Sequence, residues 1–308
     1  MHILSIIDKG TLAQLSRPSD RIATRHLLFR VLGEALLFST AVMLLADWPV
    51  PALLCFYACA IWHGFWGYAG IGHELYHSRV FSNLKLNKLL YRIASYLTWN
   101  NPGFFRKSHN YHHHHTFAAD DGEAQSTQDW RPLAVFLYLT VDLPVLLRRL
   151  YYVLINAAGL TPKEGGFTRI DGACQREAIQ MLAFNIAVQL ALWAAFEAWH
   201  INLMWFLLPF TGQFLNRLLA QSQHVGLAGA AQEGPLKHSR TLPLPALLEF
   251  LYAGMNFHAE HHLAPVIPYY NLPRLNALLL ERKLLSRIDA PSFFMKDIWL
   301  ALKTRPES

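Results

Sequence analysis

The chain is poor in charged residues and in cysteine. Of its 308 residues, 16% are charged and 53% are hydrophobic, a composition unusual for a soluble protein and typical of one embedded in a membrane. The three cysteines, Cys55, Cys59 and Cys174, form no CxxC pair, which excludes a rubredoxin-type iron site and a disulfide scaffold. Flavin and haem motifs are also missing, so any redox reaction would take its electrons from a separate protein.

Signals for secretion and for nucleic-acid binding are missing as well. The N-terminal segment contains Asp8 and Asp20 and lacks the continuous apolar core of a secretory signal, so we expect no cleaved targeting peptide. The net charge is +6, but no basic run with interleaved aromatic residues accompanies it, so nucleic acid is not an expected partner. Because no repeat or linker divides the chain, we expect one domain over residues 1–308.

Lysine and arginine are absent from residues 31–78 and 177–216. Each stretch holds two apolar runs of about the 20 residues that a membrane-spanning helix requires. The expected spans are residues 31–48, 51–71, 178–198 and 202–220. They form two hairpins whose turns, "DWPVP" and "WHIN", carry no positive charge and therefore face away from the cytoplasm. The sequence thus predicts an all-α, multi-pass integral membrane protein with both termini in the cytoplasm and a cytoplasmic helical cap from residues 73–176 and 224–308.

Residues 132–158 are apolar enough to resemble a fifth span. Asp142, Pro144 and the pair Arg148 and Arg149 interrupt them. We therefore expect a helix that lies in the membrane interface and turns its arginines toward lipid headgroups or water.

Histidine is abundant, and ten of the sixteen histidines lie in three clusters. Residues three or four apart on a helix share a face, so each cluster can direct several imidazoles at one place. The eight histidines with this spacing are His73 and His77 in "GHELYHS", His109, His112 and His113 in "SHNYHHHHT", and His258, His261 and His262 in "NFHAEHHLAP". Eight imidazoles exceed the three or four ligands of one zinc ion and suit two ions with three to five ligands each. Because imidazole binds zinc, copper, iron and nickel, these ligands do not identify the metal.

Three further residues are candidates for the same centre. His224 follows the fourth expected span on the cytoplasmic side, and from its position alone a ligand and a structural histidine are equally good interpretations. Glu74 and Glu260 stand beside cluster histidines, where carboxylates commonly orient imidazoles through the second ring nitrogen, although solvated charges are the alternative. His114 and His115 should point away from the shared face.

The three clusters resemble the histidine boxes HxxxH, HxxHH and HxxHH of the integral-membrane fatty acid desaturases and hydroxylases. The similarity covers most of the chain, because the boxes also stand in the family's places relative to two membrane hairpins. The resemblance implies two iron ions, O2 as co-substrate, and oxidation of an unactivated C–H bond in a fatty acyl chain. It also implies that His224 completes the ligand set and that an external ferredoxin or cytochrome supplies electrons.

The resemblance favours a fatty acid desaturase but leaves the reaction open. Box one is HxxxH, box three begins with His258, and no cytochrome domain is fused, which is similar to acyl-lipid, sphingolipid-like or bacterial free-acyl members. The same boxes occur in hydroxylases, carotenoid ketolases and fatty acid decarboxylases that form terminal alkenes. These reactions share the first hydrogen abstraction, and the pose of the substrate separates them.

Two other classes of protein share parts of this pattern. An intramembrane zinc protease would use HExxH, with Glu74 as base and a third ligand such as Asp171, but it leaves six clustered histidines without a role. A metal transporter should place its ligands near the centre of the bilayer, whereas these clusters lie at the cytoplasmic rim. Basic residues near the boxes, Arg79, Arg106 and Lys107, are candidates to dock an acidic electron donor or to contact lipid headgroups.

Overall fold

The computed structural model describes residues 3–118, 121–124, 130–160 and 172–285. This part of the chain contains no β-strand, and its only β-bridges are the isolated pairs Val141–Thr211 and Thr241–Phe257. The all-α prediction is therefore confirmed for these residues. The α-helices are α1 (Lys9–Leu15), α2 (Asp20–Leu44), α3 (Pro49–Gly64), α4 (Ile71–Tyr76), α5 (Leu84–Leu97), α6 (Pro102–His114), α7 (Pro132–Leu139), α8 (Leu143–Ala157), α9 (Gly172–Phe196), α10 (Trp199–Leu207), α11 (Phe214–Ser222), α12 (Pro235–His238), α13 (Ala246–Leu251), α14 (His258–Leu263) and α15 (Leu272–Glu281). Short 3-10 helices lie at Ile3–Ser5, Leu208–Phe210, Ala228–Glu233 and Tyr269–Asn271.

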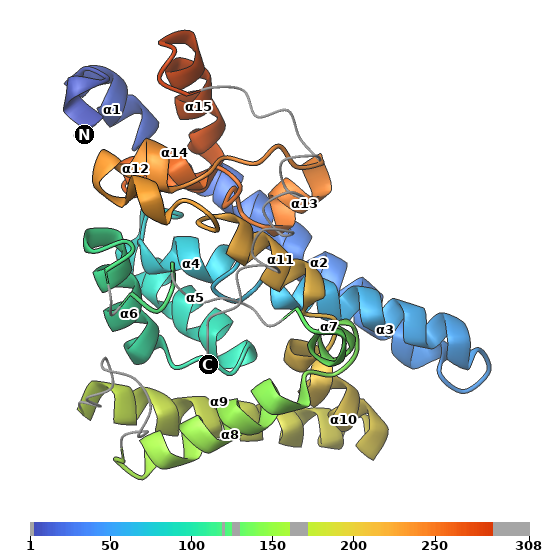
Figure 1. The fold of residues 1–308 in the computed structure, drawn as a ribbon. Coiled ribbons are helices and arrows are strands. Elements are labelled where there is room, and N and C mark those ends of the chain that lie inside the picture. Colours follow the sequence, from blue (N-terminus) through green and yellow to red (C-terminus); the bar gives the residue numbers. More distant parts are fainter. Residues whose placement is uncertain (1–2, 119–120, 125–129, 161–171, 286–308) are drawn as a thin grey trace.

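The helices fall into three regions (Figure 1). The hairpin of α2 and α3 extends from one side of the molecule, and α8, α9 and α10 form a layer along another. Between and above them lie the shorter helices α4, α5, α6, α12 and α14, with α1 and α15 at the far end. The short helices carry the three histidine clusters, so the longer helices form a frame around them.

Two helical stretches of the described residues are long and apolar enough to cross a membrane. They are Lys9–Leu44, which contains α2, and α9. Apolar side chains on both helices face outward, for example Leu36, which is 67% exposed, and Leu190, which is 64% exposed. Exposed apolar surface of this kind marks a membrane or protein interface.

The predicted spans differ from the helices in three places. The span expected at 51–71 ends at Gly64, because the chain turns there and restarts as α4. The span expected at 202–220 is not one helix, since α10 ends at Leu207 and α11 begins only at Phe214. Leu208–Phe210 form a 3-10 turn and Gly212 has a φ of +63°, a left-handed conformation that interrupts a helix. The turn of the second hairpin lies at residues 197–198, and "WHIN" already belongs to α10.

The region expected to form an interfacial helix is split into α7 and α8. Asp142 caps α8 by accepting a hydrogen bond from the backbone of Val145, which explains the interruption at this residue. The predicted orientation is wrong for Arg149, which turns inward and donates to the backbone oxygen of Thr98, whereas Arg148 is exposed. The outward side of α8 is instead apolar, with Leu147 57% and Leu154 58% exposed.

Arg30 ties the frame to the short helices. This side chain of α2 is 1% exposed and donates to the backbone oxygens of Phe65, Phe250 and Leu251 at 3.4, 2.8 and 3.1 Å. These oxygens lie at the C-terminal ends of α3 and α13, where carbonyl groups lack partners within the helix and carry partial negative charge. One guanidinium group thus caps two helices and fixes the place from which α4 begins.

The turn between α3 and α4 is closed by backbone hydrogen bonds. Ile71 donates to the oxygen of Phe65 at 3.0 Å and Gly72 donates to that of Trp66 at 3.1 Å. A Cβ atom on Gly70 would lie 2.1 Å from the oxygen of Phe65, far inside van der Waals contact. Glycine is required here by close approach of two backbone segments.

We predict that Gly70→Ala displaces α4 and lowers the free energy of unfolding by about 1–3 kcal/mol, because the added methyl group meets rigid backbone. The matched control is Gly229→Ala, since nothing lies within 4 Å of a Cβ atom at that residue. Thermal unfolding of the two variants in detergent tests the prediction. Equal midpoints for Gly70→Ala and the wild type would contradict it.

Candidate metal centre

Four segments bring nine histidines together in the interior. His73 comes from α4 and His77 directly follows it, while the second and third clusters lie on α6 and α14. His224 lies two residues after α11. The nine rings form two groups, and the ligand atoms of each group lie within 4.8 Å of one another. The first group, called the five-histidine group, is His73, His77, His109, His113 and His261, and the second, the four-histidine group, is His112, His224, His258 and His262.

The spacing of each HxxHH cluster divides it between the two groups. On α6, His109 and His113 point to the five-histidine group and His112 to the four-histidine group. On α14 the assignment is reversed, because His258 and His262 belong to the four-histidine group while His261 belongs to the other. Adjacent residues on a helix point about 100° apart, so each helix can serve two neighbouring sites.

The ring nitrogens within each group face one another at short distances. In the five-histidine group, the Nε2 atoms of His73 and His261 are 2.9 Å apart, and those of His109 and His113 are 3.0 Å apart. In the four-histidine group, the Nε2 atom of His258 lies 2.9 Å from that of His224 and 3.0 Å from that of His262. The Nε2 atoms thus converge on the centre of each group.

Second partners at Nδ1 determine which nitrogen carries the proton in three of these rings. His109 Nδ1 is 2.7 Å from Glu123, His112 Nδ1 is 3.0 Å from both oxygens of Asp121, and His224 Nδ1 is 2.9 Å from the backbone oxygen of His238. These oxygens accept hydrogen bonds, so the Nδ1 atoms donate, and in the neutral ring Nε2 is left with a lone pair. The lone pairs of these rings therefore point into the two groups.

This donor set fits metal ions. Histidine binds metals through a neutral ring with a free lone pair, commonly with the other nitrogen bonded to a carboxylate or carbonyl group. Metal–nitrogen bonds of about 2.0–2.1 Å separate neighbouring ligands by about 3.0 Å at right angles and about 3.4 Å at tetrahedral angles, close to the Nε2 separations within both groups. A cation in each group would bind lone pairs that otherwise repel one another.

Burial keeps the rings in the neutral form. Burial, reinforced by the neighbouring imidazoles, lowers the pKa of His73, His109, His258 and His262 well below its usual value. The same effects lower the pKa of His224 to about 3. Near pH 7 these rings are unprotonated and available as ligands.

The carboxylates around the centre differ from those expected. Asp121 and Glu123, which hold His112 and His109, lie in the turn after α6, and sequence reasoning missed them. The only sign of them in the sequence is their position: Asp121 follows His112 by 9 residues, and Glu123 follows His109 by 14 residues. This spacing points to the two contacts only when the turn between them is known. Glu74 lies beside His261, with Oε1 3.2 Å from Nδ1, but neither of these two atoms makes a hydrogen bond within the described residues.

Glu260 is the exception among the predicted carboxylates. Its oxygens accept hydrogen bonds from Thr241 and Asn276, each at 2.5 Å, and neither contact involves a histidine. Glu260 therefore ties α14 to α15 and to the segment before α13. The proposed orienting role of Glu260 is not supported by its hydrogen bonds.

Other candidate residues lie away from the groups. His114 and His115 are exposed, as expected from their direction on the helix, and His114 Nδ1 donates to the backbone of Asn110. Asp171, the third ligand in the protease alternative, lies outside the described residues. In that alternative Glu74 would act as a free base, whereas here it faces His261.

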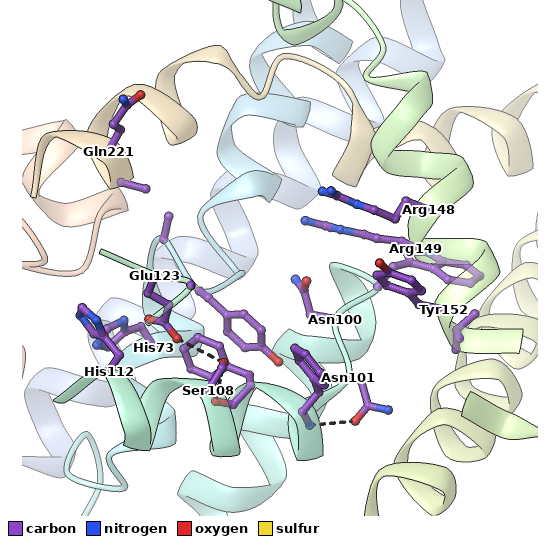
Figure 2. A pocket seen from close by; sticks show the side chains of 18 of the residues that line it. His73, Asn100, Asn101, Ser108, His112, Glu123, Arg148, Arg149, Tyr152 and Gln221 are labelled. Atoms are coloured by element: carbon purple, nitrogen blue, oxygen red, sulfur yellow. Dashed lines mark hydrogen bonds between the residues drawn. The ribbon is translucent and has the colours of Figure 1, made fainter. Parts of the chain in front are cut away.

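A cavity of about 550 Å³ opens beside the histidine centre, within the usual range for small-molecule sites. His73, His112, His224 and His258 line one end, so both groups are reached from the same space. Aromatic side chains, including Tyr68, Trp99, Phe104 and Phe105, form much of the remaining wall. Figure 2 shows His73 and His112 on one side of this space and residues of α8 on the opposite side.

The fold and the site define a helical protein with two buried histidine groups suited to metal ions and two apolar helices long enough to cross a membrane. The sequence profile of the fatty acid desaturase family matches residues 46–289, most of the chain. The protein therefore belongs to the fatty acid desaturase family, whose members are metal-dependent oxidoreductases of fatty acyl chains and are typically membrane-bound. No curated protein matches the chain.

Asp121 gives a direct test of how the ligands are oriented. Besides His112, its oxygens accept hydrogen bonds from the backbone of Phe117, Glu123 and Ala124 at 2.8, 3.1 and 3.3 Å. We predict that Asp121→Asn lowers metal affinity by about 10- to 100-fold, because the ring of His112 loses its charged partner. Competition with a chelator measures the affinity, and Asp47→Asn, in the exposed turn before α3, is the control. An unchanged affinity in Asp121→Asn would contradict the orienting role.

Proposed function

We propose that the protein is a membrane-bound, di-iron and O2-dependent oxidoreductase that acts on an unactivated C–H bond of a fatty acyl chain, with desaturation as the reaction. The observation that carries this proposal is the pair of adjacent histidine groups that open onto one aromatic-lined cavity. A single zinc site would leave one group without a role. Family membership supports the acyl substrate and the oxidative chemistry.

In this proposal the five-histidine group holds one iron ion and the four-histidine group holds the other. When bound, the two ions supply the redox chemistry by which O2 is reduced and an unactivated C–H bond is oxidised. All-nitrogen ligation by imidazole is compatible with redox-active iron. Asp121 and Glu123 hold the rings of His112 and His109, respectively, in the orientation that presents Nε2. Glu74 lies 3.2 Å from Nδ1 of His261.

The residues that line the cavity also position the acyl chain and exclude water. The aromatic wall contacts methylene groups, and His73, His112, His224 and His258 mark the end of the cavity where oxidation takes place. Enclosure of this end by buried rings limits access of water to reactive species. Hydroxylation and decarboxylation would begin from the same hydrogen abstraction, so the pose of the chain in this cavity selects the product.

We extend the proposal to the membrane topology. The exposed apolar faces of α2, α3, α8, α9 and α10 lie in bilayer, with both termini and the histidine centre on the cytoplasmic side. Support comes from the absence of lysine and arginine in the α2–α3 and α9–α10 turns and from the outward apolar side chains of these helices.

The metal proposal predicts about two iron ions per chain. His112 and His261 belong to different groups, so His112→Ala and His261→Ala should each reduce the content to about one ion, and the double variant should bind almost none. Oxidation of fed fatty acids should stop in both single variants. Metal analysis of detergent-purified protein, with His200→Ala on the exposed surface as control, provides the measurement. One zinc ion that persists in both single variants but is lost in His73→Ala would contradict the proposal and favour the zinc protease alternative, in which the HExxH segment binds the metal.

Electrons reach the centre from a separate acidic protein in this proposal. A hollow beside His77 is lined by Lys88, Arg92 and Arg106, and Arg79 is exposed nearby in sequence. Positive charge around such an opening steers an acidic donor toward the metals. Lys107 directly follows Arg106 and belongs to the same basic segment.

Charge reversal tests this docking surface. We predict that Arg79→Glu with Arg106→Glu slows reduction by an acidic ferredoxin or cytochrome by about 10-fold at low salt, with a smaller effect at high salt because the attraction is screened. Stopped-flow reduction measures the rate, and Arg21→Glu on α2 is the control. Equal reduction rates for the variant and the wild type at low salt would contradict the proposal that this surface docks the electron donor.

A further inference from the structure

Two arginines lie at the end of the cavity that is farthest from the histidines in Figure 2. Arg148, which is exposed, and Arg149, which is half-buried, extend from α8 toward the cavity, opposite His73 and His112 (Figure 2). Both line the same cavity as these histidines. A molecule that fills the cavity would therefore meet positive charge at one end and the metal ligands at the other.

Apart from Arg148, the exposed side of α8 is apolar or aromatic, unlike that of a helix on a water-exposed surface. Its outward residues include Leu147, Tyr151 and Leu154, which are 57%, 55% and 58% exposed. Arg149 and Asn156 occupy the inner side, two turns apart, where both line the cavity. Apolar surroundings outside explain the outward leucines, but they do not explain a charged group facing the interior, which is costly unless it has a partner.

The protein itself supplies little to neutralise this charge. Arg149 donates one hydrogen bond to the backbone oxygen of Thr98, whereas a guanidinium group has five N–H donors. The carboxylate of Asp142, on the first turn of α8, is already paired with Arg217. In the described part of the chain, Arg148 has neither a hydrogen bond nor an ion pair. The cavity end therefore carries more positive than negative charge.

Asn156 adds a second, independent sign of a missing partner. It is 4% exposed, and its side-chain oxygen is buried without a hydrogen bond in the described residues. The oxygen and nitrogen of an amide can exchange places by rotation, so Asn156 can turn N–H donors toward the cavity. Buried polar groups normally have a partner, and a ligand would supply one here.

We propose that Arg148 and Arg149 bind the anionic end of the acyl substrate and that Asn156 assists them. Arginine pairs with carboxylate and phosphate groups through parallel N–H bonds, so the anion is the carboxylate of a free fatty acid or a phosphate attached to a carrier. The aromatic wall at Tyr68 and Phe105 then holds the methylene chain between the arginines and the histidines. The inference rests on the proposed function for the identity of the ligand as an acyl chain. If the anionic end is fixed at the arginines, its distance from the histidines determines which carbon of the acyl chain reacts.

Direct binding tests the proposal without relying on catalysis. The probes are palmitate, palmitoyl-CoA and methyl palmitate, titrated into detergent-purified protein whose metal content is measured in the same sample. The wild type should bind at least one anionic probe about 10-fold or more tightly than methyl palmitate, since hydrogen bonds to charged groups contribute at this level. Preference for palmitate identifies a carboxylate, and preference for palmitoyl-CoA alone identifies a carrier phosphate.

The variant Arg148→Gln with Arg149→Gln should remove this preference and leave the affinity for methyl palmitate unchanged. Because Arg149 also contacts Thr98, two single variants guard against a folding defect. Arg148→Gln, which removes no hydrogen bond of the described residues, should reduce the preference about 3-fold or more, and Arg149→Lys should retain much of it because it keeps the charge. Arg274→Gln, exposed on α15, is the matched control and should bind like the wild type.

Two results would overturn the arginine site. One is equal affinity of the wild type for the ester and for both anionic probes, and the other is an anionic preference that survives in the double variant. The metal measurement keeps this outcome separate from the proposed function. A protein that binds two iron ions without anionic preference loses only this inference, whereas one that prefers the anion without two iron ions loses the di-iron assignment.

Discussion

The convergence of imidazole nitrogens is the constraint on which the rest of the structure depends. In His109, His112 and His224, where Nδ1 is bonded outward to an oxygen, the Nε2 lone pair points into the centre of a group, and Nε2 atoms there approach to 2.9 Å in the pairs His73–His261 and His224–His258. The protein brings the rings together by burying them, and burial in turn keeps them neutral. A metal ion bound at these rings would therefore couple its binding to folding.

Short helices carry this constraint, and they are stable only because the frame holds them. α4 and α14 have six residues each, too few for an isolated helix to persist in water. Arg30 fixes the ends of α3 and α13, the close approach at Gly70 sets where α4 begins, and Glu260 anchors α14 to Asn276. The long apolar helices thus serve the site by fixing the positions from which the short helices start.

Local spacing predicted which histidines come together better than it predicted the architecture. The i, i+3, i+4 pattern is a property of one helix, so it identified the histidines of each cluster, and the resemblance to a known family added His224, which the structure places in the four-histidine group. The division of His112 and His113 between two groups depends on how α6 meets α14, which spacing within one helix does not contain. Apolar composition likewise identified α2 and α9, but it could not detect the break at Gly212.

Contacts between distant segments account for the other differences. The role of Asp121 depends on a turn that folds back onto α6, and Glu260 was misassigned because its partners Thr241 and Asn276 are distant in sequence. Arg149 was expected to face outward because sequence alone does not say which side of α8 meets the protein. Its inward direction depends on the segments that pack against α8, such as the turn at Thr98 that accepts its hydrogen bond.

The central claim is that each histidine group holds its own iron ion, and locating the ions in an experimental structure of the iron-loaded protein tests it most directly. Anomalous scattering at the iron edge distinguishes iron from zinc and gives the position of each ion. We predict two iron peaks, one surrounded by His73, His77, His109, His113 and His261 and the other by His112, His224, His258 and His262. A single peak, zinc in place of iron, or ions bound outside these two groups would contradict the account.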